Sequence, residues 1–118
     1  CGYGWHCRYA AEQGAKAVLG IDLSEKMLES AAWRTRSAAV TYRLCGIEDY
    51  EYPENTWDCV ISNLALHYIA DTIFRKIYKT LKPGGTLLFN IEHPSFTAGV
   101  DQDWIYSEDG KILYWPID

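Results

Sequence analysis

Residues 1–22, C-G-Y-G-W-H-C-R-Y-A-A-E-Q-G-A-K-A-V-L-G-I-D, place a glycine turn, a helix and a short apolar strand in direct succession. The pattern predicts a helix over Trp5 to Gln13, which Gly14 ends, and a strand over Ala17 to Asp22. A glycine turn before a helix lets the backbone approach a ligand closely, and the first N–H groups of the helix attract a negatively charged group. We therefore expect a ligand site at this turn.

The rest of the chain continues the alternation of helix and strand, which predicts an α/β fold with a parallel sheet. Ser24 is placed to cap a second helix. The further expected elements are a strand over Val40 to Leu44, an acidic loop over 46–56, a strand over Trp57 to Asn63, a helix capped by Asp71, a Lys82–Gly85 stop, a strand over Thr86 to Glu92 and a β-hairpin over Trp104 to Trp115.

Composition limits the class of partner. The 118 residues are 48% hydrophobic, enough for one domain or a piece of one, and the net charge is −5 with no basic run. This charge argues against nucleic acid and against an anionic membrane surface as partners. None of the four cysteines forms a Cys-x-x-Cys pair or a zinc-like spacing, so we expect no metal site and free thiols in a reducing cytoplasm.

Asp22 ends a strand and stands 18 positions after Gly4. In Rossmann-like sheets, a carboxylate about 20 residues after the glycine turn accepts hydrogen bonds from ribose hydroxyls. Two structural alternatives stay open: an ordinary loop-to-helix turn at Gly2-x-Gly4, and an Asp that enters the next helix. Cys7 stands where the dinucleotide pattern has its third glycine, which weakens a nicotinamide interpretation.

Five segments together resemble the class I S-adenosylmethionine-dependent methyltransferases, in particular small bacterial and archaeal members. They are C-G-Y-G-W-H-C-R-Y-A-A, V-L-G-I-D-L-S-E-K-M-L, W-D-C-V-I-S-N-L-A-L-H-Y-I, L-K-P-G-G-T-L-L-F and I-E-H-P-S-F-T-A. The resemblance implies a Rossmann-like, doubly wound, mostly parallel sheet with S-adenosyl-L-methionine as cofactor and S-adenosyl-L-homocysteine as product. It also implies one partial cofactor-binding domain over residues 1–118, in which 92–118 begin the acceptor-side region.

The resemblance assigns roles around the first strand. Gly2 and Gly4 match the glycines that lie against the methionine part of the cofactor. Asp22 matches the ribose-binding acid, and Leu23 looks like the residue that packs on adenine.

Further roles follow from later segments of the same resemblance. Ile47 and Glu48 fall in the loop that borders the adenine edge. Asn63 and Leu64 match the end of the fourth family strand, where backbone groups face the methionine part.

Two departures from the family pattern stand out. The acid of the adenine loop is replaced by Gly46, and the neighbouring Glu48 or Asp49 could take its place. The family's central first strand and its last two strands have no counterpart here. We therefore expect a fragment in which another chain fills the gap or the flanking strands meet, with a homo-oligomer or strand exchange between copies as one consequence, and the fragment alone could bind cofactor weakly or be inactive.

Catalysis would need a base only if the acceptor must lose a proton. His67 is the first candidate and His93 the second, because His67 and Tyr68 follow the fourth family strand near the expected acceptor. Both histidines also have structural interpretations: a backbone-bonded imidazole for His67 and a chain-direction change at His93-Pro94.

The predicted function is therefore methyl transfer from S-adenosylmethionine to a small-molecule acceptor in the cytoplasm. Two other classes remain open. One is an NAD(P)-dependent oxidoreductase with a Rossmann fold, and the other is a truncated, non-catalytic interaction domain.

Overall fold

The computed structural model describes residues 1–66, 72–93 and 104–114. Helices and strands alternate along most of this length, as the sequence predicts. The elements are α1 (Trp5–Glu12), β1 (Val18–Asp22), α2 (Glu25–Arg34), β2 (Val40–Leu44), β3 (Trp57–Asn63), α3 (Thr72–Thr80), β4 (Leu81–Asn90), β5 (Ile105–Tyr106) and β6 (Ile112–Tyr114).

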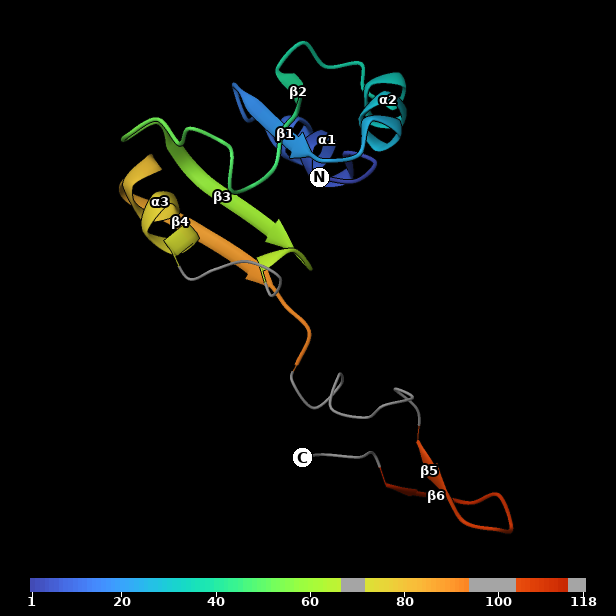
Figure 1. The fold of residues 1–118 in the computed structure, drawn as a ribbon. Helices are drawn as coiled ribbons and strands as arrows, with labels where there is room; N and C mark the ends of the chain where they lie inside the picture. Colours follow the sequence, from blue (N-terminus) through green and yellow to red (C-terminus); the bar gives the residue numbers. More distant parts are fainter. Residues whose placement is uncertain (67–71, 94–103, 115–118) are drawn as a thin grey trace.

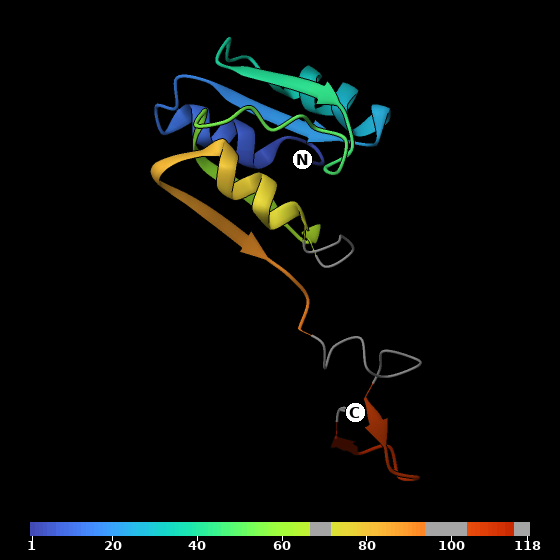
Figure 2. The same ribbon diagram turned by 60° about the vertical axis from the view of Figure 1, so that its left-hand side comes forward.

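The described strands form three pairs (Figure 1). β1 runs parallel to β2 with Gly20 opposite Tyr42, and β3 runs parallel to β4. β5 and β6 are antiparallel, which confirms the predicted hairpin. The hairpin lies apart from the other described elements (Figures 1 and 2). The predicted α/β class with parallel strands is confirmed.

The slot between β1 and β3 holds none of the described strands, and these two strands do not pair with each other. Main-chain groups alternate in direction along a parallel strand. The carbonyl of Asp22 accepts the N–H of Cys45 toward β2, so the carbonyl of Ile21 points to the opposite, free edge. There it accepts from the amino group of Cys1 at 2.7 Å. The expected gap is therefore present, and the flanking strands do not close it.

One layer of packing joins α1 and α2 to the β1–β2 pair. Cys7 from α1 and Leu28 and Ala31 from α2 are its buried apolar side chains. Ser24 caps α2 as predicted, because its Oγ accepts the N–H of Met27 at 3.4 Å. The capping residue lies two positions after the end of β1, so α2 starts at Glu25, directly after the cap.

A second core lies under α3. Leu66, Ile73 and Ile77 form its buried centre. Partly buried apolar side chains from β3, β4 and the loop after β2 pack against it: Ile47, Tyr52, Val60, Leu81 and Leu87. The loop over 45–56 thus contributes to the same core as the second strand pair.

β4 begins earlier than the sequence predicts. Leu81 already pairs with Trp57, whereas the next pair along the two strands joins Thr86 to Cys59, so the Lys82–Gly85 segment forms an irregularity inside the strand. Gly84 in this segment has a φ of 80°, a left-handed value that glycine adopts without a Cβ clash. The expected helix stop is therefore also a bulge, and β4 ends at Asn90 rather than Glu92.

Ile77→Ala should lower the free energy of unfolding by about 2–5 kcal/mol, because it leaves a cavity at a side chain that is only 2% exposed. Tyr78→Ala is the matched control on the same helix, since Tyr78 is 82% exposed. Urea denaturation of both variants measures the difference. Equal losses in the two variants would contradict the assignment of the core.

Candidate functional site

Asp22 at the carboxyl end of β1 is the centre of the candidate site. Its Oδ2 accepts the N–H of Gly2 and the amino group of Cys1, each at 2.7 Å, and its Oδ1 accepts the N–H of Ser24 at 2.9 Å. One carboxylate therefore holds the glycine turn against the strand end and the entry to α2. The structure thus brings Gly2 and Asp22 together, as the sequence suggests.

The ionisation of Asp22 follows from these contacts. Partial burial opposes the charged form, but the hydrogen bonds from the Cys1 amino group and from the N–H groups of Ser24 and Gly2 outweigh it. Together they lower the pKa of Asp22 to about 2. A carboxylate offers about four acceptor positions, so Oδ1, which accepts from Ser24, retains room for a further donor.

Gly4 gives the turn its shape. It is the N-cap of α1 with a φ of 71°, and among the described residues no side chain caps this helix. The carbonyl of Cys1 accepts the N–H of Gly4 at 3.0 Å, which closes the turn. The first N–H groups of α1 are thus left at the turn without a side-chain acceptor.

Close packing of α1 on β1 explains why a cysteine can stand at position 7. A Cβ at Gly20 would lie 2.9 Å from Cys7 Sγ, closer than packed carbon and sulfur atoms come. The small residue that permits this approach is therefore the glycine on the strand. In the dinucleotide pattern it is a glycine on the helix, at the position of Cys7.

Leu23 is the most exposed residue beside Asp22. Its side chain is 77% exposed. A Cβ at Gly46 would lie 3.3 Å from Leu23 Cδ2 and 2.8 Å from Asp49 Oδ2. The Asp49 carboxylate therefore occupies the space in which residue 46 would carry its side chain, next to Leu23. The sequence suggested Glu48 or Asp49 in place of the missing acid, and only the loop conformation separates the two.

Ile47 and Glu48 lie in the same loop, where the Ile47 side chain and the Glu48 backbone carbonyl contact the region of α3. The Ile47 side chain packs against the core under α3, and its carbonyl accepts the Tyr52 hydroxyl at 2.8 Å. The Glu48 carbonyl accepts from Lys76 Nζ at 2.9 Å. Neither contact points these residues at Asp22.

Asn63 ends β3, and Leu64 follows it, on the side of the molecule where β1 also ends (Figure 1). Leu64 has a φ of 54°, an uncommon value for a residue with a branched side chain, and its N–H donates to the Asn90 carbonyl at 2.8 Å. Backbone strain of this kind is often kept where a site needs it.

Of the two candidate bases, only His93 lies among the described residues. His67 and its neighbour Tyr68 lie outside the described residues. His93 is exposed and follows the end of β4 by three residues. The proposed base role of each histidine stays a prediction.

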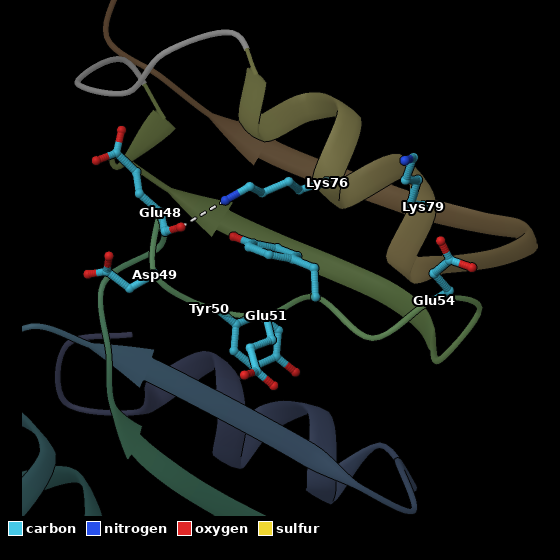
Figure 3. Close-up of a pocket in the computed structure, with 8 residues that line it drawn as sticks. Glu48, Asp49, Tyr50, Glu51, Glu54, Lys76 and Lys79 are labelled. Carbon is cyan, nitrogen blue, oxygen red and sulfur yellow. Dashed lines mark hydrogen bonds between the residues drawn. The ribbon is translucent and has the colours of Figure 1, made fainter.

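A surface cavity of about 440 Å³ lies between α3 and the loop after β2 (Figure 3). Its lining is charged and aromatic: Glu48, Asp49, Tyr50, Glu51, Tyr52, Glu54, Lys76 and Lys79. Burial raises the pKa of Tyr52 to about 12, so its hydroxyl stays protonated and bonded to the loop. Asp22 and the glycine turn do not line this cavity, so we do not assign the candidate site to it.

Over 1–66, 72–93 and 104–114, no three His, Cys, Asp or Glu side chains gather as metal ligands would. None of the described helices has both the length and the apolar character to cross a bilayer.

Comparison with known proteins gives a consistent result. A family model described as a methyltransferase domain matches residues 1–89. A Listeria monocytogenes structure assigned as an S-adenosylmethionine-dependent methyltransferase is 52% identical and superposes with a TM-score of 0.93, covering 100% of this chain and 54% of its own. An S-adenosylmethionine-dependent methyltransferase from Mesorhizobium loti is 43% identical with a TM-score of 0.78, covering 83% of this chain and 46% of its own.

Sequence relatives point the same way. Phosphoethanolamine N-methyltransferase 1 of Triticum aestivum is 39% identical over 94 residues, which are 76% of this chain and 19% of that protein. The chain thus spans about half the length of the two similar structures and less of the wheat relative.

Acid should destabilise the 118-residue chain, in which the Cys1 amino group bonds to the Asp22 carboxylate, through Asp22. The pKa of an unperturbed Asp is near 3.9, whereas the pKa of Asp22 is about 2 in the fold. The stabilisation is therefore complete above about pH 4 and is lost as the pH falls toward 2. Thermal unfolding between pH 5 and 2 should show a shallower loss in Asp22→Asn than in wild type, while Asp58→Asn, an exposed control, should follow wild type. Parallel curves for Asp22→Asn and wild type would refute this role.

Proposed function

Because this chain belongs to the methyltransferase domain family, we propose that its protein transfers a methyl group from S-adenosylmethionine to a small-molecule acceptor. The observation that carries the proposal is the contact between the glycine turn and Asp22, in which the Gly2 N–H donates a hydrogen bond to the carboxylate at 2.7 Å. These contacts place the glycine turn beside a carboxylate whose Oδ1 can accept a further hydrogen bond.

The residues fit the chemical groups of this cofactor. Asp22 Oδ1 can accept a ribose hydroxyl, and the exposed Leu23 side chain offers an apolar surface to a flat base. The first N–H groups of α1 can donate to the methionine carboxylate, which the helix dipole favours. Asp49 stands beside Leu23 and can accept from the exocyclic amine of adenine.

The cofactor supplies a methyl group already activated by its attachment to a sulfonium. The chain's own contribution is then mainly to hold the reacting partners in line and to exclude water. Asp22, Leu23 and the Gly2–Gly4 turn would orient the cofactor from one side. Asn63 and the strained Leu64, at the end of β3, would approach it from the other. His67, or less directly His93, would take a proton from an acceptor that must lose one.

The acceptor class rests on charge and on the relatives' chemistry. A net charge of −5 without a basic run favours a small molecule over nucleic acid. The wheat relative is named for a small amine, phosphoethanolamine, and methylates nitrogen. Residues 92–118 would begin the acceptor-side region.

Two other functions make different predictions. An NAD(P)-dependent oxidoreductase should bind NADH, whereas the close packing at Cys7 departs from the dinucleotide pattern. A non-catalytic interaction domain should bind no nucleotide at all.

Calorimetric titration of the full-length protein separates these functions. S-adenosylmethionine and S-adenosylhomocysteine should both bind, and NADH should not. At a hundredfold excess over the dissociation constant, each sulfur ligand should stabilise the fold by about 2.7 kcal/mol. Asp22→Ala should weaken both affinities by about tenfold or more, because it removes a charged acceptor.

Asp58→Ala serves as the matched control, since Asp58 is an exposed acid bonded to Lys82 on the other strand pair. Its affinities should equal those of wild type. A folded protein that binds neither sulfur ligand would rule out the methyltransferase proposal, and binding of NADH alone would favour the oxidoreductase.

A further inference from the structure

Tyr42 fills the space that two glycines leave open. It lies on β2 directly opposite Gly20 on β1. A Cβ at Gly20 would come within 2.8 Å of the Tyr42 ring atom Cδ1. A Cβ at Gly4 would collide with the Tyr42 hydroxyl and lie 2.9 Å from Cζ. The Tyr42 side chain therefore contacts Gly20 in the middle of β1 with its ring and Gly4 in the glycine turn with its hydroxyl end.

The Tyr42 hydroxyl has a defined partner. Its oxygen lies 2.8 Å from Thr35 Oγ1. Thr35 donates its own proton to the Ala31 carbonyl at 2.7 Å. A threonine hydroxyl has one proton, so the Tyr42 O–H donates to Thr35. The C-terminal end of α2 thus fixes the Tyr42 hydroxyl at the position where it contacts Gly4.

Gly4 connects this support to the candidate site. Its left-handed conformation closes the turn through the bond to the Cys1 carbonyl, and the same turn presents the Gly2 N–H to Asp22. The turn is therefore held at two points. Asp22 binds the Gly2 N–H at the end of β1, and the Tyr42 hydroxyl, held by Thr35, contacts Gly4.

We propose that Tyr42, held by its hydrogen bond to Thr35, is a positioning residue. It sets the position of the Gly2–Gly4 turn relative to β1, and so the place where the turn can bind the methionine part of the cofactor. Tyr42 acts through Gly4 and does not itself touch the ligand. The inference rests on the proposed function, in which the turn faces the methionine part and Leu23 faces adenine. It predicts that losing the hydroxyl affects one end of the ligand only.

Tyr42→Phe keeps the ring between the two glycines and removes the contact beneath Gly4. Thr35→Val removes the acceptor of the same bond. Each variant should weaken S-adenosylhomocysteine binding by about three- to tenfold, the size of one hydrogen bond's net effect. The double variant should lose no more than either single one, because both remove the same bond.

The discriminating probe is 5′-methylthioadenosine, which has the adenosine end of the cofactor and lacks its amino-acid part. Its affinity for the full-length protein should be unchanged in Tyr42→Phe and Thr35→Val. Leu23→Ala should weaken both ligands, because it acts on adenine. Thr35→Ser, which keeps the hydroxyl, and Thr41→Val, which removes a different hydroxyl from β2, should bind both ligands as wild type does.

Calorimetry on variants with wild-type circular dichroism gives a clear decision. Unchanged S-adenosylhomocysteine affinity in both Tyr42→Phe and Thr35→Val, or equal losses for the two ligands, would overturn the positioning role while leaving the proposed function intact. A wild-type protein that binds neither ligand would instead overturn the proposed function, and this inference with it.

Discussion

A single carboxylate, that of Asp22, ties together the parts of the chain from which the candidate site is built. It accepts the N–H of Gly2 from the turn before α1 and the N–H of Ser24 at the entry to α2. These segments are neighbours only because β1 returns the chain to the turn. The charge that organises the local fold is therefore the same charge that a ribose would meet, so structure and proposed function depend on one side chain.

Close approach is the second constraint, and glycines provide it. Because Gly20 has no side chain, Cys7 Sγ from α1 and the Tyr42 ring from β2 can both pack closely against β1. Gly4 lets the turn rest on the Tyr42 hydroxyl. A side chain at either position would push the helix or the turn away from Asp22. The packing of the first strand pair thus sets the position of the turn relative to Asp22.

Local patterns were enough to predict the turn, the Ser24 cap, the strand that ends in Asp22 and the β5–β6 hairpin, because each depends on residues close in sequence. The early start of β4 was missed because its bulge depends on pairing with β3. Tyr42 was missed for a related reason, since only the register of β1 and β2 places it under Gly4. His67 lies outside the described residues, so its role stays a prediction.

The most direct test of the central claim is a crystal structure of the full-length protein with S-adenosylhomocysteine. We expect the ribose hydroxyls within hydrogen-bond distance of the Asp22 carboxylate, adenine against Leu23 and the amino-acid part at the turn that Gly4 closes. A ligand in the cavity beside Lys76 and Lys79, with Asp22 bonded only to its own backbone partners, would contradict the account.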